Sequence, residues 1–203
     1  MTVTRDKAVR LHAGPKLSVS GTLIIAGAAP RVFEDVQRAR SVRPGAPLMA
    51  LNEVGAAFKD IAHLYAGHHN KAALYLSYRE SKGFSGVGFP IHACWAHNRK
   101  MPACVTHQWS GAATGGTSAL TAARVALAMG YTEVILAGCP LDDSGYFNPK
   151  ETDALDHDGC PRVGYGQKLR MYRHRFMADI NARGRDGIVS MSGWTWEVLG
   201  GPR

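Results

Sequence analysis

Short apolar segments alternate with helix-like segments along most of the chain, and this alternation restricts the fold more than any other feature. The segments are rich in β-branched and aliphatic residues, as strands buried on both faces are. The expected strands are Thr22–Ala26, Leu48–Leu51, His63–Ala66, Glu133–Ala137 and Gly187–Met191, with two shorter pieces around IHACW (91–95) and ACVTH (103–107). The pattern predicts an α/β fold with a mostly parallel sheet flanked by helices.

The expected helices begin and end at recognisable residues. Pro30 suits the first helical position of residues 30–40 because its φ angle is already helical, and Gly130 is a typical stop for the helix Thr117–Met129. Further helices are expected over 71–80, 167–183 and 192–200. Residues 139–165 are polar and glycine-rich, and their length predicts a lid-like loop. Without an internal repeat or a linker, residues 1–203 are expected to form one domain.

Composition narrows the class of partner. The 203 residues carry a formal net charge of +8, which favours acidic partners such as nucleotides, sugar phosphates or nucleic acid, although a solvated basic surface is the simpler interpretation. No apolar run approaches the ~20 residues that span a bilayer, and the first residues lack the apolar core of a signal peptide. With four scattered cysteines that suit a reducing compartment, we expect a cytoplasmic protein that does not bind membranes.

Several strand ends carry residues suited to ligand binding. In open parallel sheets, ligands lie beyond the carboxyl ends of the strands. The turn Gly27–Ala29 is small, Asn52 offers an amide, and the helix mouth at Gly116, Thr117 and Ser118 is small and hydroxylated, as an anion site requires. A tight turn and helix caps are the alternatives. Neither a GxxxxGK[ST] loop nor a complete GxGxxG fingerprint is present.

Three segments resemble one enzyme family. They are LIIAGAAPRVFEDV, ALNEV and GGTSALTAARVALAMGYTEVILAGCPLDDSGYF, within residues 20–55 and 114–150. Their order and spacing resemble bacterial sialyltransferases that use CMP-sialic acid, and related sugar transferases and archaeal pterin-pyrophosphokinase-like proteins of the same Rossmann-type fold. In that family a strand leads into a G-x-G-P-S turn, a second strand ends in asparagine, and a T-S-G step opens a helix that ends in A-L-G-Y.

The resemblance implies roles for the strand ends. Gly27 and Ala28 would approach the phosphate and ribose of a nucleotide, and Asn52 would contact the nucleotide. Thr117 and Ser118 would hold the nucleotide or its sugar. The family transfers a sugar with inversion and without a required cofactor or metal, so the resemblance implies a nucleotide-sugar donor as co-substrate.

The resemblance also implies a catalytic pair. A lid histidine deprotonates the acceptor hydroxyl in this family, and tyrosine hydroxyls stabilise the departing phosphate. Here Tyr146 matches a family tyrosine. His157, within DHDG, is the candidate base, with Asp156 or Asp158 to orient it, and a solvated polar loop is the alternative. His69, within GHHNK after the third strand, is a second candidate base.

The chain departs from the family at several positions, and its turn G-A-A-P-R lacks the asparagine and the serine of the family's G-N-G-P-S turn. Arg31 stands where the family has serine, Cys139-Pro140 replaces an acidic residue, and the second tyrosine falls near Asp142. These differences favour a nucleotide sugar other than CMP-sialic acid. Asp142 and Asp143 are either an ordinary loop start or the ligands of a divalent cation bound against a diphosphate.

Two further groups of residues carry alternatives. Arg170, Arg173 and Arg175 of the expected basic helix either bind phosphate or face solvent. A second group has local spacing suited to zinc, although core cysteines on two short strands are the simpler interpretation because no common zinc motif has this spacing. Its members are His92, Cys94, His97, Cys104 and His107.

These observations favour a glycosyltransferase that moves a sugar from a nucleotide donor to a hydroxyl. The net charge makes a hydroxymethylated base of phage-type DNA a reasonable acceptor. The alternatives are a Mg²⁺-dependent phosphoryl or pyrophosphoryl transferase, for which Asp142 and Asp143 would hold the metal, and a non-catalytic nucleotide-binding module. Whether the chain forms a homo-oligomer is left open by the sequence.

Overall fold

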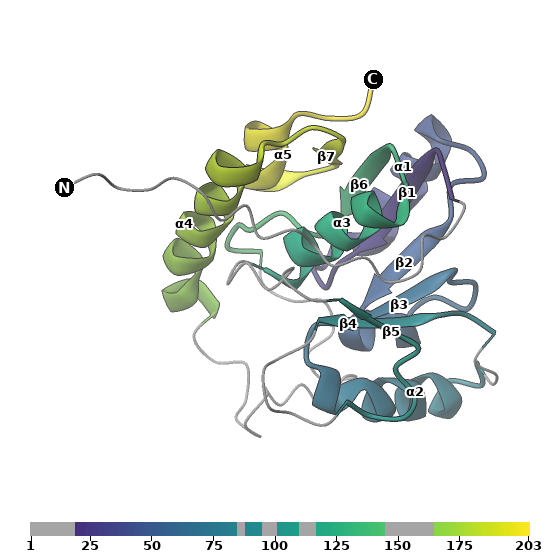
Figure 1. The fold of residues 1–203 in the computed structure, drawn as a ribbon. Coiled ribbons are helices and arrows are strands. Elements are labelled where there is room, and N and C mark those ends of the chain that lie inside the picture. Colours follow the sequence, from purple (N-terminus) through teal and green to yellow (C-terminus); the bar gives the residue numbers. More distant parts are fainter. Residues whose placement is uncertain (1–18, 85–87, 95–100, 110–116, 145–164) are drawn as a thin grey trace.

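The computed structural model describes residues 19–84, 88–94, 101–109, 117–144 and 165–203. Within them one seven-stranded sheet has the order β5-β4-β3-β2-β1-β6-β7, and every pair of neighbours is parallel (Figure 1). The strands are β1 (Thr22–Ala26), β2 (Leu48–Leu51), β3 (His63–Ala66), β4 (Ile91–Cys94), β5 (His107–Trp109), β6 (Glu133–Ala137) and β7 (Ile188–Ser190). The fold class predicted from the alternating pattern is confirmed.

Five α-helices and two 3₁₀ turns join or follow these strands. The helices are α1 (Val32–Val42), α2 (Ala72–Ser81), α3 (Ser118–Met129), α4 (Tyr165–Arg183) and α5 (Gly193–Leu199), and the turns are η1 (Asn52–Ala56) and η2 (His69–Lys71). In Figure 1, α4 and α5 lie near β7 at one end of the sheet, and α2 lies near β4 at the other. Gly130 ends α3 with φ of 117°, as expected of a glycine stop.

The two faces of the sheet have separate cores because successive side chains of a strand point to opposite sides. Leu23 and Ile25 of β1 pack on the face that carries α3, α4 and α5, whereas Ile24 and Ala26 pack on the face that carries α1. On this second face, α2 packs against β3 and β4, where Leu64 contributes to its core. The central strands are thus buried on both sides, which explains their nearly continuous apolar sequences.

Two strands differ in their bounds from the prediction. The second short strand, expected around ACVTH (103–107), begins only at the last residue of that segment and covers His107–Trp109, because the amide of Val105 turns back to donate to the carbonyl of Pro102 (3.0 Å). Thr106 then bonds Ile91 with both its amide and its hydroxyl. The last strand is shorter than 187–191, because Gly187 has φ of 74°, which a strand does not adopt.

A buried ion pair joins α3 to α4. Arg124 donates from Nε (3.0 Å) and Nη2 (2.8 Å) to Oδ1 of Asp179, and Nη2 also donates to the carbonyl of Gly184. Both side chains are almost inaccessible to solvent, so each charge depends on the other. The pair holds α4 against the core through its inward face. Among the residues described, no helix has both the length and the apolar character needed to cross a membrane.

Candidate functional site

The direction of the strand order reverses between β1 and β6. From β1 the chain moves outward through β2, β3, β4 and β5, and α3 then carries it back to place β6 on the other side of β1. In open α/β sheets such a reversal leaves a crevice beyond the carboxyl ends of the two strands, where ligands bind. The segments that follow β1 and β6 are residues 27–29 and 138–141, and they therefore border the position where a ligand is expected.

Gly27 is packed against the segment that follows β6. Its amide donates to the carbonyl of Ala137 (2.8 Å), and the next amide but one, of Ala29, donates to the carbonyl of Gly138 (3.0 Å). A Cβ atom at position 27 would collide with Sγ of Cys139 and would lie 2.5 Å from the Gly138 oxygen. Glycine is therefore required here by the chain itself. Contact of Gly27 or of the neighbouring Ala28 with a ligand stays a prediction.

A buried carboxylate binds the segment that follows β6 from the α1 side. Asp35, 1% exposed in the first turn of α1, accepts bonds at Oδ2 from the amide of Gly138 (3.0 Å) and from the hydroxyl of Ser192. Thr195 donates to the carbonyl of Cys139 (2.9 Å). Burial raises the pKa of the Cys139 thiol to about 12, so it remains protonated and is unsuited to act as a nucleophile near neutral pH. This network ties α1 and residues 192–195 to the segment that follows β6.

Arg173 of α4 reaches the loop after β6. Its Nε donates to the carbonyl of Leu141 (2.8 Å), and its guanidinium lies over the ring of Trp194, 5.1 Å from the centroid. Leu141 has φ of 47°, a conformation that costs a branched side chain free energy. The contact thus helps hold a strained turn, and it brings a fixed cation to the carboxyl edge of the sheet.

Asn52, Gly67 and Ser118 come together on the β2 and β3 side of the switch point. Oδ1 of Asn52 accepts a bond from the amide of Gly67 (2.8 Å). A Cβ atom at Gly67 would collide with Oγ of Ser118, so the serine hydroxyl lies directly against the glycine. Asn52 has φ of 53°; Asn52 and Leu141 are the two non-glycine residues with positive φ in the described part of the chain, and both follow strands at this edge. Strained residues of this kind cluster at functional sites.

The mouth of α3 carries an ordinary cap. Thr117 is the N-cap residue, and its hydroxyl accepts a bond from the amide of Leu120 (3.2 Å). The side chain of Thr117 is thus used by the helix, as the simpler interpretation of TGGTS predicted. Ser118 is left as the hydroxyl that faces Gly67. Gly116 lies outside the described residues.

The candidate catalytic residues are only partly within the described chain. His157 and Tyr146 lie outside it. His69 is buried in the 3₁₀ turn after β3, two residues beyond Gly67. Asp142 accepts bonds at Oδ1 from the amide of Ser144 (3.0 Å) and from its hydroxyl, as a turn residue does. Among the residues described, no three His, Cys, Asp or Glu side chains form a metal site.

One of the candidate zinc ligands, His92, belongs instead to a buried hydrogen-bonded chain. Trp109 donates from Nε1 to Nδ1 of His92 (3.1 Å), whose Nε2 is 3.1 Å from Nδ1 of His63; Nε2 of His63 is in turn 3.0 Å from the Tyr131 hydroxyl. We call these four residues the histidine chain. Burial lowers the pKa of His63 to about 4 and that of His92 to about 3, so both rings are neutral at physiological pH.

The two cysteines of the same group lie on opposite sides of the sheet. Cys94 accepts a bond from the Tyr65 hydroxyl (3.1 Å) and packs near α3, whereas Cys104 packs against the core under α2. Since His92 uses both ring nitrogens in the histidine chain, the described members of the group do not converge on a metal. The core interpretation of these residues is the one that agrees with the structure, and His97 lies outside the described residues.

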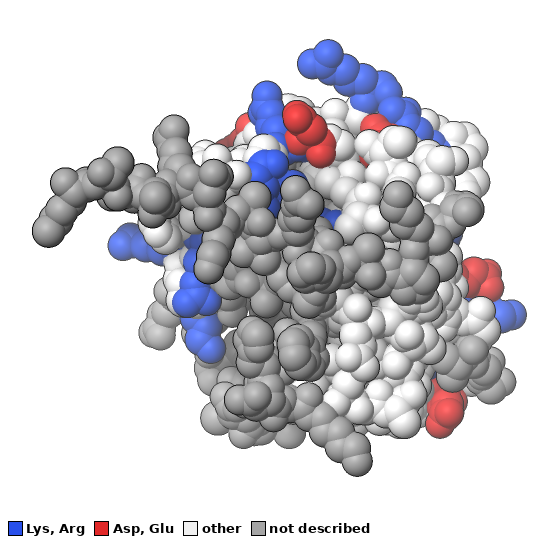
Figure 2. Space-filling view, viewed as in Figure 1, with Lys and Arg blue, Asp and Glu red and all other residues white. Residues whose placement is uncertain are grey.

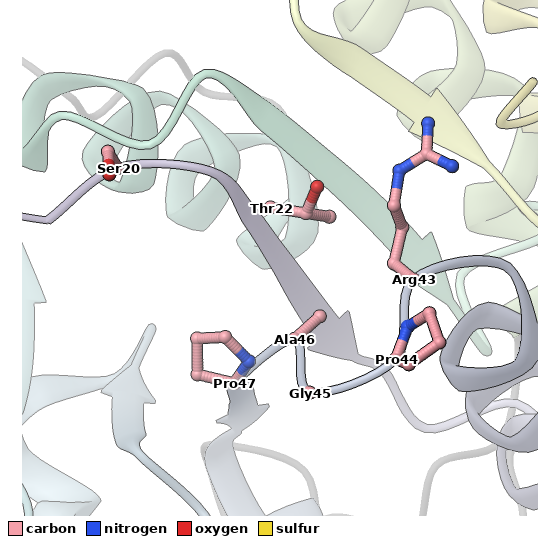
Figure 3. A pocket seen from close by; sticks show the side chains of 7 residues that line it. All are labelled: Ser20, Thr22, Arg43, Pro44, Gly45, Ala46 and Pro47. Atoms are coloured by element: carbon pink, nitrogen blue, oxygen red, sulfur yellow. The ribbon is translucent and has the colours of Figure 1, made fainter.

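A hollow of ≈ 280 Å³ lies at the opposite, amino edge of the sheet. Figure 3 shows its lining residues, which precede β1 and β2 except for Thr22, the first residue of β1. Arg43 is the charged residue among them, but its guanidinium binds both oxygens of Glu133 (2.7 and 3.0 Å) and the carbonyl of Arg203 (2.9 Å). This cation is already neutralised, so the hollow is a weaker candidate than the carboxyl edge.

The sequence matches no protein-family model, and it has no match among the curated proteins or the solved structures. The function is therefore argued from the fold and from the residues at the carboxyl edge. Sequence reasoning placed Asn52 and Ser118 there, and the structure brings them together through Gly67. Sequence reasoning did not single out Asp35. The available signal was an acid in the first turn of a helix, but an acid there also suits a simple interaction with the helix dipole.

Proposed function

We propose that the protein binds a nucleotide-activated sugar at the carboxyl edge of the sheet and transfers the sugar to an acceptor hydroxyl. The observation that carries the proposal is the convergence of Asn52, Gly67 and Ser118 beside a topological switch point. Asn52 accepts from Gly67 with its amide oxygen, which leaves the amide nitrogen to donate to a base or a ribose. The resemblance of these segments to sialyltransferase-like enzymes supplies the reaction type.

In the proposed reaction the acceptor oxygen attacks the anomeric carbon of the donor sugar, and the bond from that carbon to the phosphate oxygen breaks. The acceptor proton passes to a histidine, and the phosphate leaves with the nucleotide. His157 and His69 are the two candidate bases, and Tyr146 would donate to the departing phosphate. A hydroxymethylated base of phage-type DNA is one acceptor to test, since the net charge is +8.

A positioned cation supports transfer without a metal. The guanidinium of Arg173 is held at the loop after β6 by Leu141 and Trp194, where negative charge would develop on a leaving phosphate. By contrast, Asp142, which with Asp143 would hold the metal in the alternative Mg²⁺-dependent phosphoryl transfer, already accepts two bonds from Ser144 at Oδ1. These two observations favour the sugar transferase over its alternative.

Thermal unfolding with CMP, UDP, GDP and their sugar conjugates, each with and without Mg²⁺, tests the proposal. A ligand at 100 times its Kd adds about 2.7 kcal/mol to the free energy of unfolding. We expect a metal-independent shift with one nucleotide sugar. A shift that requires Mg²⁺ and a triphosphate would favour phosphoryl transfer, and no shift with any nucleotide would contradict the proposal.

Matched variants locate the site. Ser118→Ala and Asn52→Gly should weaken nucleotide binding about tenfold each, because each removes one hydrogen-bonding side chain worth about 1.4 kcal/mol. Glycine at 52 keeps the positive φ accessible, so backbone strain does not confound the result. The controls are Ser81→Ala and Asn181→Ala, both exposed and remote from this edge. Equal affinities of all four variants would place the ligand elsewhere.

A further inference from the structure

The outward surface of α4 is basic in the first half of the helix. Lys168 and Arg175, two turns apart, are exposed on one flank of it, Arg170 is exposed on the opposite flank, and His174 lies between them. These three cations have no acidic partner among the residues described by the structure. In Figure 2 the Lys and Arg side chains along the left flank cover the position that α4 has in Figure 1. We call Lys168, Arg170 and Arg175 the α4 basic surface.

The helix has one acidic residue, and it points inward. Asp179 is 5% exposed and is held by Arg124 of α3, with Arg183 3.5 Å from its other oxygen. The carboxylate therefore neutralises the inner guanidinium groups and not the α4 basic surface. A solvated helix usually intersperses both signs of charge on its outer face. The absence of acid on the described outer face of α4 leaves an uncompensated positive field.

The apolar side of α4 is already used. Phe176 is fully buried, with its ring 5.7 Å from that of Trp194, and Ile180 is 9% exposed in the same core. A helix that inserts into a lipid surface needs a free apolar face. Among the side chains of α4 that the structure describes, Met171, 37% exposed, is the one large apolar side chain on the outer face. The surface is therefore suited to a partner that it recognises by charge.

We propose that the α4 basic surface binds the phosphate backbone of nucleic acid. Arginine supplies two of its three cations, and a guanidinium bonds phosphate oxygens in pairs. Lys168 and Arg175 are separated by about 10 Å along the helix axis, and duplex DNA carries one negative charge per about 1.7 Å, so several phosphates face this span. The binding does not require sugar transfer, and it holds or fails independently of the proposed activity.

The test measures binding of the full chain to a short labelled DNA duplex by fluorescence anisotropy, without donor, across a salt series. The triple variant Lys168→Ala/Arg170→Ala/Arg175→Ala should lose three phosphate contacts. Since each contributes about 0.9 to the slope of log K against log [salt], wild-type affinity should fall about 40-fold more than that of the variant between 50 and 200 mM salt.

The control variant Arg40→Ala/Lys59→Ala/Lys82→Ala removes the same net charge from exposed positions on other elements. It should retain nearly the wild-type slope. Equal losses in both variants would mean that net charge and not the α4 basic surface binds DNA, and would overturn the proposal. The proposal would also be overturned if the wild-type protein failed to bind DNA at low salt. The same holds if these residues were needed for binding to phosphatidylserine vesicles and not for binding to DNA.

Discussion

The histidine chain makes the stability of the fold depend on pH, and its geometry fixes the direction. Trp109 can only donate, so Nδ1 of His92 accepts and the proton of His92 lies on Nε2. That proton is donated to Nδ1 of His63, and the proton on Nε2 of His63 is donated to Tyr131. A second proton on either ring would place two donors against each other within a buried core. Each protonation therefore breaks a bond and buries a charge.

The folded-state pKa values, about 4 for His63 and about 3 for His92, lie below the value of 6.5 expected in the unfolded chain. The unfolded state thus binds protons first, and the free energy of unfolding falls as pH drops from about 6.5 toward these values. Between about pH 7.5 and pH 5 the linkage relation gives a loss of about 2 kcal/mol per histidine. Together the two histidines lower the free energy of unfolding by at most about 4 kcal/mol over this range, since any solvent that reaches the rings screens the charge.

Urea unfolding at the two pH values measures this loss. His92→Asn should be less stable than wild type at the higher pH but should lose about 2 kcal/mol less on acidification. The control His174→Asn changes an exposed histidine of α4 and should retain the full pH dependence. If wild type, His92→Asn and His174→Asn all lost the same free energy, the argument from the histidine chain would be wrong.

Three further substitutions test the packing of the fold by urea unfolding. Gly138→Ala should lower the free energy of unfolding by about 2–4 kcal/mol, because φ is 63° and the new Cβ would lie 2.6 Å from Cβ of Val32. The control Gly83→Ala has φ of 76° but open space around the new Cβ, so it should lower the free energy of unfolding by only about 1–2 kcal/mol. Equal losses in the two variants would refute the packing argument. Arg124→Met should lower the free energy of unfolding by about 3–5 kcal/mol, because it leaves Asp179 buried without its main partner. Arg38 is exposed and lies 4.0 Å from Asp35, so Arg38→Met should change the free energy of unfolding by less than about 1 kcal/mol. Thr117→Ala should cost about 1 kcal/mol through loss of the α3 cap, and Thr117→Ser should restore most of it unless the hydroxyl is irrelevant.

The strands could be predicted because burial on both faces leaves a continuous apolar sequence. Thr22–Ala26, Leu48–Leu51, His63–Ala66 and Glu133–Ala137 have the predicted bounds for that reason. The short strand expected around 103–107 begins only at His107, because Val105 is as apolar as a strand residue although its amide turns back to Pro102. A local bond of this kind leaves no mark in the hydrophobic pattern.

The candidate site could be predicted only where the chemistry lies in the side chain itself. Asn52 and Ser118 have polar groups at strand and helix ends, and these were found. Glycine is required at position 67 because Ser118, 51 positions later, lies against it. A single glycine after a strand does not by itself predict such a contact. Asp35 meets its partner Ser192 across 157 positions. His92 was noted only as a possible zinc ligand and His63 only as a strand residue, because their assembly into a chain depends on the register of β3, β4 and β5.

β1 lies between β2 and β6, and this position has a consequence during synthesis of the chain. Thr22 pairs with Glu133 across 111 positions, so the second edge of β1 has no partner until the ribosome has made β6. At about 5–20 residues per second this interval is roughly 5–20 s. Throughout it, Leu23, Ile24 and Ile25 belong to an apolar strand with one open edge, the kind of edge that pairs with other chains. The nascent protein is therefore most exposed to aggregation before β6 emerges, and a chaperone that shields that edge would raise the yield of folded chain.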